Sequence, residues 1–181
     1  MITTGCYLAS LDIRDAFYSV PIFYKHVHKK LLKFSFKGKA YRFEVIPNGY
    51  VDDAMRVFTK ILKPVFAHLK ERGHSSVIYV DHSLLKGDSY EECLESIEAT
   101  RLLLESLGFY VHYDKSILTP TRTIVFLGFE IDTVSLTVSL TTEKKQNIKD
   151  YCNKLLDRTH ISIRLKILGN IAASFEGCGA W

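Results

Sequence analysis

The first third of the chain has the pattern of a buried strand followed by a hairpin. Residues 7–13 are a short, mostly apolar run, which predicts a buried strand that carries Asp12 to its tip, and residues 14–19 indicate a tight helical turn. From residue 31 apolar and basic positions alternate, and the alternation returns at residues 41–45 after a Lys-Gly-Lys turn. We therefore predict a hairpin with one solvent-exposed, basic face. The aromatic side chains of the hairpin are expected to point toward the core. These are Phe34, Phe36, Tyr41 and Phe43.

The middle of the chain alternates helices with short strands. Apolar residues at helical spacing over residues 51–69 predict an amphipathic helix that Pro64 kinks and Gly73 ends. A strand over residues 77–80, a tight corner at Asp81-His82 and a returning strand over residues 83–85 come next. A second helix, capped by Ser89, ends at Gly108.

The remaining pattern completes an α+β fold. Short strands are predicted over residues 109–113, 123–131 and 136–140, and helices over residues 142–156 and 162–175. The order of elements favours an antiparallel sheet with helices packed on one face. We predict a main domain over residues 1–140 and a C-terminal helical segment over residues 141–181.

Composition narrows the class of protein without deciding it. A chain of 181 residues that is 47% hydrophobic has enough apolar material for one globular core, and its net charge of +4 is compatible with nucleic acid as a partner. The four cysteines form no CxxC pair, the N-terminus lacks the pattern of a secretory signal, and no apolar run is long enough to cross a membrane. We expect reduced thiols and an intracellular location, in the cytoplasm or the nucleus, with no membrane partner.

Two aspartates carry the candidate chemistry. Asp12 and Asp81 each lie at the end of a short apolar strand, and carboxylates at neighbouring strand ends are a common way to hold Mg²⁺ for phosphoryl transfer. Paired metal ions stabilise both the attacking and the leaving oxygen. Taken alone, two strand-terminal aspartates are more often a coincidence than a site.

The surrounding sequence resembles the catalytic motifs of reverse transcriptases. Five segments in the order of that family cover Leu11 to Asp132: residues 11–22, 46–60, 79–82, 107–116 and 126–131. They resemble the first two catalytic motifs, the Tyr-x-Asp-Asp hairpin, the motif after that hairpin, and the strand pair called the primer grip. The chain is thus similar to a polymerase palm with part of a fingers hairpin, followed by a segment like a thumb or connection. Residues 162–169 are similar to the segment after the palm in DIRS-like retrotransposons.

The resemblance implies roles for individual residues. Asp12 and Asp81 would bind Mg²⁺ or Mn²⁺, with help from the Ile13 carbonyl. Phe17 would exclude a ribose 2′-hydroxyl, and Lys115 would protonate the pyrophosphate leaving group. Taken singly, an aromatic at position 17 is more typical of a core and a lysine at position 115 of a solvated surface. The implied site is catalytic at Asp12, Asp81, His82 and Lys115, nucleotide-binding at Asp15, Ala16, Phe17, Asn48 and Gly49, and metal-binding at Asp12, Ile13 and Asp81.

Two departures from the family pattern lower the expected activity. Residues 50–53 spell Tyr-Val-Asp-Asp, but they lie between a Pro-Asn-Gly turn and a helical pattern, so Asp52 and Asp53 are expected to cap the helix. There they would repel the phosphates of template and nucleotide. His82 replaces the last aspartate of the catalytic hairpin, and imidazole is a poor ligand for Mg²⁺. We therefore expect impaired catalysis.

Three functions remain open from the sequence. The first is an RNA-directed DNA polymerase domain of a retroelement, which transfers nucleotides from dNTPs to the primer 3′ end on an RNA or DNA template, as part of a larger polyprotein. The second is a catalytically dead remnant that keeps the fold and binds nucleic acid. The third, a Mg²⁺ nuclease or another two-carboxylate phosphotransferase, fits less well because it would require acids on a mixed sheet without the Phe126-Leu127-Gly128 hairpin. The lysines of the basic hairpin fit either a phosphate-tracking surface or an ordinary solvated face.

Overall fold

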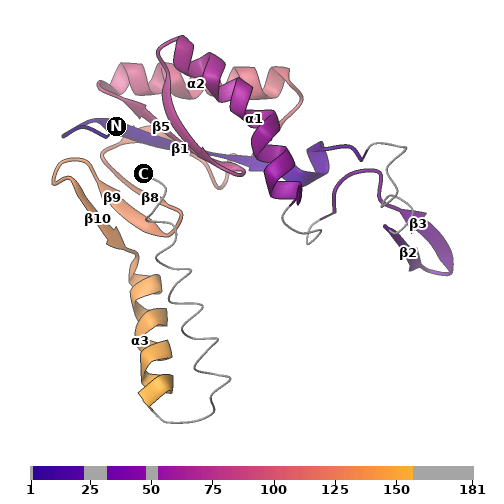
Figure 1. The fold of residues 1–181 in the computed structure, drawn as a ribbon. Coiled ribbons are helices and arrows are strands. Elements are labelled where there is room, and N and C mark those ends of the chain that lie inside the picture. Colours follow the sequence, from indigo (N-terminus) through magenta and orange to yellow (C-terminus); the bar gives the residue numbers. More distant parts are fainter. Residues whose placement is uncertain (1, 23–31, 48–52, 157–181) are drawn as a thin grey trace. The chain divides into compact units, whose positions relative to one another are not determined.

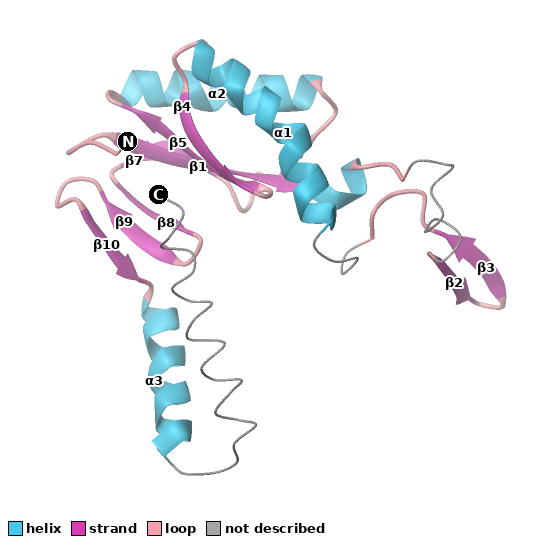
Figure 2. Cartoon of the chain, in the orientation of Figure 1, coloured by secondary structure: helices cyan, strands magenta, loops and turns pink. Residues whose placement is uncertain are grey.

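The structure is a computed structural model that describes residues 2–22, 32–47 and 53–156 of the chain. The chain forms two compact units, Met1–Thr121 and Arg122–Trp181, and each is described by itself. The boundary between these units precedes the hairpin at residues 123–132, which the sequence pattern assigns to the main domain ending at residue 140. The fold of each unit depends on its own strand pairing (Figures 1 and 2).

An antiparallel sheet forms the centre of the first unit, and its middle strand is the one that carries Asp12. The strands run in the order β4, β5, β1, β6, with β7 also paired to β1. Their bounds are β1 Tyr7–Arg14, β4 Ser75–Tyr79, β5 His82–Gly87, β6 Tyr110–Val111 and β7 Ile117–Thr121. Strand β7 is absent from the predicted elements, because Pro120 interrupts its pattern. It is a strand through its pairing with β1, a segment far from it in the sequence.

Helices α1 (Asp53–Glu71) and α2 (Tyr90–Ser106) cover one face of this sheet, as Figure 1 shows. Successive side chains of a strand point to opposite faces, so Leu11 and Ile13 of β1 enter the core that contains Phe58 and Leu62 of α1. Asp12, between them, points to the opposite face. The predicted α+β fold, an antiparallel sheet with helices on one face, is confirmed.

The two long helices begin and end through local interactions that the sequence indicates. The Ser89 hydroxyl accepts a hydrogen bond of 3.1 Å from the backbone N–H of Glu92, which caps α2. Gly108 adopts a φ of 87° just after α2, and Gly73 a φ of 93° just after α1. Pro64 lies within α1, which continues on both sides of it.

The basic hairpin forms as predicted, but three of its four aromatic side chains are exposed and the fourth, Phe43, is half-buried. Among the strands that the structure describes, β2 (Lys33–Phe36) and β3 (Lys39–Arg42) pair only with each other. The prediction that the rings point toward the core is wrong: Phe34, Phe36 and Tyr41 are 44%, 55% and 43% exposed. The rings instead pack on one another, with Phe34 stacked on Tyr41 at 5.5 Å between centroids. A two-stranded ribbon has no second layer to bury its apolar face, and the alternation alone does not show this.

The second unit contains a three-stranded antiparallel sheet followed by a helix. Its elements are β8 (Thr123–Phe126), β9 (Phe129–Asp132), β10 (Thr137–Leu140) and α3 (Thr142–Leu156). Leu127 and Gly128 both adopt positive φ in the turn between β8 and β9. Lys144 of α3 donates to the Leu127 carbonyl at 3.1 Å, and its ammonium group lies 4.6 Å from the centre of the Phe129 ring. The predicted helix at residues 142–156 is confirmed, and the helix predicted at residues 162–175 lies outside the described residues.

Among the residues that the structure describes, no helix combines the length and the apolar character needed to cross a membrane.

Candidate metal site

Strand pairing brings Asp12, Asp81 and His82 together, with Asp12 on the face of the sheet opposite α1 and α2. Asp12 of β1 lies directly opposite His82, the first residue of β5, in the antiparallel register. His82 also pairs with Tyr79 of β4, so the turn between β4 and β5 consists of Val80 and Asp81. The predicted corner at Asp81-His82 is therefore wrong by one residue, because His82 already belongs to the strand.

The turn that presents Asp81 is held by both its backbone and its packing. Val80 adopts a φ of 57°, a conformation that costs about 1–3 kcal/mol and persists only where the surrounding structure enforces it. Its side chain packs against the core below the sheet. The Ile13 backbone N–H donates to the Asp81 carbonyl at 2.9 Å. These contacts keep Asp81 beside the end of β1.

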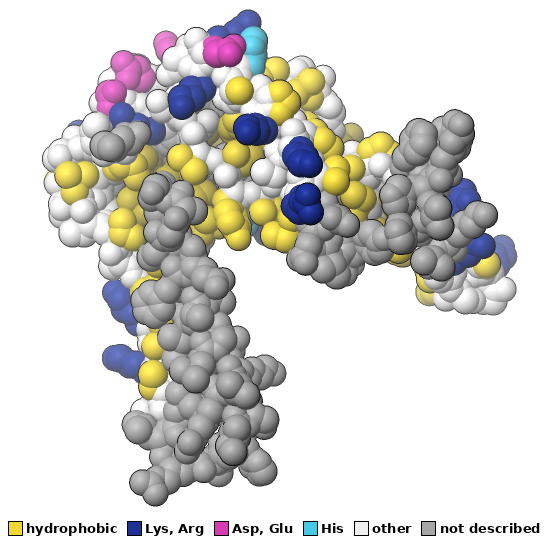
Figure 3. All heavy atoms as spheres, viewed as in Figure 1, with side chains coloured by type: hydrophobic (Ala, Val, Ile, Leu, Met, Phe, Trp, Pro, Cys, Tyr) yellow, Lys and Arg dark blue, Asp and Glu magenta, His cyan; other side chains and the backbone are white. Residues whose placement is uncertain are grey.

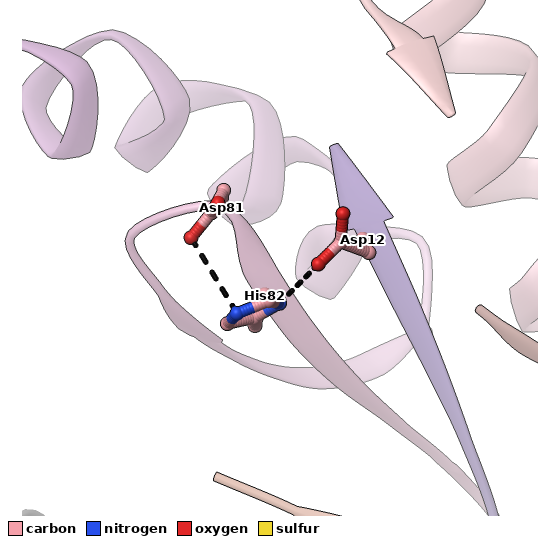
Figure 4. A group of neighbouring side chains, drawn as sticks. All are labelled: Asp12, Asp81 and His82. Atoms are coloured by element: carbon pink, nitrogen blue, oxygen red, sulfur yellow. Dashed lines mark ion pairs between the residues drawn. The ribbon is translucent and has the colours of Figure 1, made fainter. Parts of the chain in front are cut away.

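The imidazole of His82 lies between the two carboxylates, as Figure 4 shows. Its Nδ1 is 2.5 Å from Oδ2 of Asp12, and its Nε2 is 3.8 Å from Oδ1 of Asp81. One ligand atom from each side chain falls within 4.8 Å of the others, and no other such His, Cys, Asp or Glu group occurs in the described part of the chain. The Asp12 side chain is 8% exposed, while those of Asp81 and His82 are 32% and 42% exposed. The cluster is thus anchored on its buried side and reachable from solvent.

Hydroxyl groups that the sequence pattern did not single out fix the backbone around Asp12. The Asp12 N–H donates to the Ser116 hydroxyl at 3.0 Å, and that hydroxyl donates to the His112 carbonyl at 2.8 Å. The His112 N–H returns a bond of 2.8 Å to the Asp12 carbonyl. On the other side, the Ser83 hydroxyl donates to the Leu11 carbonyl at 3.1 Å. Ser116 lies in one of the five motifs, but its role depends on β1 meeting that turn in space.

The other predicted site residues that the structure describes lie just after β1 and in the turn at residues 112–116. Asp15 is exposed with a φ of 51°, and Ala16 after it is buried. Phe17 is half-buried and meets the ring of Phe58 edge-on at 6.0 Å between centroids. Lys115 is exposed in the turn at residues 112–116. Asn48, Gly49 and Asp52 lie outside the described residues, as does the side chain of Asp53.

The donor set fits Mg²⁺ only in part. The carboxylates of Asp12 and Asp81 are hard oxygen ligands of the kind that Mg²⁺ takes. Imidazole nitrogen suits zinc, copper, iron and nickel instead. His82 also contacts Oδ2 of Asp12, one of the two oxygens that this carboxylate offers to a metal ion. These residues do not supply the all-oxygen environment of a two-magnesium centre.

Solved structures of viral polymerases share this fold. The chain is similar to a foamy viral protease-reverse transcriptase in complex with double-stranded DNA, with a TM-score of 0.73 and 22% identity over 93% of this chain and 28% of that one. It is also similar to a foamy viral protease-reverse transcriptase in complex with an RNA/DNA hybrid, with a TM-score of 0.64 and 24% identity over 80% of this chain and 18% of that one. At these identities the likeness shows the fold alone. The chain spans less than a third of the length of either structure.

The family is shown by the sequence itself. Residues 2–131 match the family model described as reverse transcriptase (RNA-dependent DNA polymerase), and this range spans the first unit from residue 2 onward together with most of the β8–β9 hairpin. The matched range contains the three clustered side chains and all five motifs. The chain belongs to the reverse transcriptase family.

Proposed function

We propose that this chain is the palm of an RNA-directed DNA polymerase from a retroelement, and that its nucleotidyl transfer from dNTP to the primer 3′ end is impaired. The observation that carries the proposal is the pairing of β1 with β5, which brings Asp12 into one cluster with His82 and Asp81. Family membership supports the polymerase part of the proposal. The incomplete fit of these three side chains to Mg²⁺ supports the impairment.

The carboxylates of Asp12 and Asp81 are the groups that would hold the divalent cation, Mg²⁺ or Mn²⁺, in this reaction. A bound cation would stabilise the charge that develops on the transferred phosphoryl group. The chain's own part is to hold both carboxylates at fixed positions, which the contacts of Ser116 and Ile13 support. Beside them, Phe17 would select the sugar and Lys115 would supply a proton, as the family resemblance implies.

His82 is the physical reason for the expected impairment. A third carboxylate would add a negative charge and two more oxygen ligands, whereas imidazole adds one nitrogen and makes a direct contact with Asp12 at 2.5 Å. Before Mg²⁺ could use that Asp12 oxygen, the contact would have to break. The competing proposal, a catalytically dead remnant that still binds nucleic acid, rests on this same contact.

The β2–β3 hairpin supports nucleic acid as the partner. Its rings at Phe34, Phe36 and Tyr41 are exposed, and basic side chains accompany them on the same ribbon (Figure 3). Lys37 extends its ammonium group to 5.4 Å from the centre of the Phe36 ring. Exposed rings can stack on unpaired bases while lysines neutralise phosphates, which is how many proteins hold single strands. The described hairpin thus favours a primer–template surface over a merely solvated face.

The comparison structures support the proposal that this palm is part of a larger protein. Both are described as protease-reverse transcriptases, and this chain matches 28% or less of each. The RNA/DNA hybrid and the double-stranded DNA belong to those complexes. We extend both kinds of duplex to this chain as proposed partners, together with dNTPs, and propose that it is one segment of a polyprotein.

Primer extension tests the catalytic part of the proposal. The purified chain is incubated with an RNA template, a labelled DNA primer, dNTPs and either Mg²⁺ or Mn²⁺. We expect slow extension by the natural chain, at least about tenfold faster extension by His82→Asp, and none by Asp12→Asn. Robust extension by the natural chain, equal to that of His82→Asp, would show that His82 does not impair the reaction.

Binding measurements test the nucleic-acid part separately. Affinity for a labelled RNA/DNA hybrid with a single-stranded template overhang is measured by fluorescence anisotropy at several salt concentrations. Replacing Lys37 and Lys39 with alanine is expected to lower the slope of log affinity against log salt by about 1.4–1.8, since each phosphate contact contributes about 0.7–0.9. The matched control replaces Lys63 and Lys70 of α1. Equal effects of the two double variants would leave the hairpin lysines as ordinary surface charge.

A further inference from the structure

The side chains of Asp12, Asp81 and His82 form one cluster of two carboxylates and one imidazole. Each can supply one ligand atom, and these atoms lie within 4.8 Å of one another. Figure 4 shows the imidazole flanked by both carboxylates. A cluster of carboxylates alone would suit many cations or none. The imidazole nitrogen makes this set of ligands selective among metal ions.

Nitrogen and carboxylate ligands together favour borderline transition metals over magnesium. Zn²⁺ accepts His nitrogen and Asp oxygen at about 2.0–2.2 Å, and its reactive sites use three protein ligands with a fourth position left open. Mg²⁺ instead requires near-octahedral oxygen ligands and gives up its water reluctantly. The order of affinities for a mixed nitrogen and oxygen site also rises from Mn²⁺ through Co²⁺ and Ni²⁺ to Cu²⁺.

The distances are compatible with such a site after small side-chain rotations. Ligand atoms of a tetrahedral zinc ion with bonds of about 2.0–2.1 Å stand about 3.3 Å apart. One ring nitrogen and one oxygen of each carboxylate lie within 4.8 Å of one another, and Nδ1 of His82 is 2.5 Å from Oδ2 of Asp12. Because one imidazole gives a metal ion only one nitrogen, the ring would have to turn so that this nitrogen faces both carboxylates. Insertion of a metal ion between Asp12 and His82 needs those two groups to part by about one ångström. Both His82 and Asp81 are partly exposed, so their side chains have room to rotate.

The backbone positions of all three ligands are already fixed. Asp12 and His82 are paired residues of neighbouring strands. The Asp81 carbonyl accepts from the Ile13 N–H, and the Asp12 N–H donates to Ser116. Ligands on rigid elements lose little freedom when a metal ion binds, which favours affinity.

From this geometry we propose that Asp12, Asp81 and His82 form a site for one transition-metal dication of the zinc type, and that it binds such an ion in preference to Mg²⁺. The inference rests on the proposed function only for the location of the site. It adds that the substitution at position 82 changes which metal the palm holds. A palm loaded with one such ion keeps its nucleic-acid surface, while it lacks the pair of magnesium ions on which rapid nucleotidyl transfer depends.

Metal titration of the chain, without nucleotide or nucleic acid, tests the proposal. The protein carries no polyhistidine tag and is stripped with a chelator. Zn²⁺, Co²⁺ and Mg²⁺ are then titrated by calorimetry, with Co²⁺ also followed by its visible absorption. We expect one Zn²⁺ or Co²⁺ per chain. Mg²⁺ should bind at least about 100-fold more weakly.

Variants locate the binding and control for the other histidines. Loss of a residue that only hydrogen-bonds to a metal ligand already lowers metal affinity roughly 10–100-fold. His82→Ala removes a ligand itself, so it is expected to weaken Zn²⁺ binding by more than about 100-fold. His82→Asp is expected to weaken Zn²⁺ binding and strengthen Mg²⁺ binding. His68→Ala, which removes an exposed histidine on α1, is the matched control and should change neither. Equal Zn²⁺ affinity in His82→Ala and the natural chain would overturn the proposal.

A measurement on the natural chain keeps the test valid if a variant fails to fold. X-ray absorption of the Zn²⁺-loaded protein should show one imidazole among oxygen ligands. An all-oxygen shell, several imidazoles or Mg²⁺ binding as tight as Zn²⁺ binding would each refute the inference. The binding and extension assays of the proposed function use nucleic acid instead, so either proposal can fail without the other.

Discussion

Phe58 is the residue whose replacement should reveal most about how the palm is held together. Its side chain is fully buried in α1, and its ring meets Phe17 and Phe109 edge-on, each at 6.0 Å between centroids. It thus joins the long helix to the segment after β1 and to the end of α2. We expect Phe58→Ala to loosen the packing among these three pieces.

The size of the effect is set by burial and by the ring contacts. Truncation of a fully buried phenylalanine costs about 3–5 kcal/mol, which is a large part of the roughly 5–15 kcal/mol that stabilises an ordinary domain. Each edge-on ring pair adds about 0.5–1.5 kcal/mol beyond the area buried. A double-mutant cycle with Phe17→Ala should therefore show a coupling of about 0.5–1.5 kcal/mol. Phe17 is also the ring implied in sugar selection, so its support by Phe58 links stability to the site.

Urea unfolding followed by circular dichroism measures the loss. The midpoint should fall sharply in Phe58→Ala while the slope stays the same, because the surface exposed on unfolding changes little. Val57→Ala on the same helix is the control, since Val57 is 39% exposed and should change stability by no more than about 0.5 kcal/mol. A loss below about 1 kcal/mol in Phe58→Ala, or one no larger than in the control, would refute this view of the core.

Other features of the first unit lead to further predictions. Gly87→Ala should lower stability by about 1–3 kcal/mol in the same unfolding assay, because an added Cβ would lie 2.2 Å from the backbone nitrogen of Cys93; an unchanged midpoint would mean that β5 and α2 can separate freely. Ser89→Ala should cost about 1 kcal/mol by removing the cap on the Glu92 N–H, whereas Ser89→Asp should keep most of the stability. Burial raises the pKa of the Cys93 thiol from 9.0 to about 11, so the unfolded chain loses this proton first and stability should fall as the pH rises from about 9 to about 11. That fall should be smaller in Cys93→Ala, and an equal fall in both proteins would assign it to other groups.

The elements that depend on neighbouring residues could be predicted from the sequence. The helix at residues 142–156, the Ser89 cap and the strand that carries Asp12 depend on spacing and on local hydrogen bonds. Such features involve residues a few positions apart, so the linear pattern is enough to predict them. Sequence motifs also placed the chain in its family, because their order along the chain is itself a linear property.

Burial and strand pairing across long distances could not be predicted in the same way. The alternation in the basic hairpin indicated a strand face but not whether anything covers it, and the rings of Phe34 and Tyr41 turned out to be exposed. Strand β7 forms through its pairing with the distant strand β1, which no local pattern indicates. The contact between Ser116 and Asp12 joins residues 104 positions apart in the chain.

In the candidate metal site, some features follow from the sequence and others only from the tertiary structure. The sequence alone determined its members: two strand-end aspartates, and a histidine where an acid is expected. Only the tertiary structure decided that the imidazole lies between the carboxylates, since this depends on the register that sets Asp12 opposite His82 and on the Val80 turn that presents Asp81. The physical reason is that ligand identity belongs to single residues, whereas ligand geometry depends on strands brought together by a shared core.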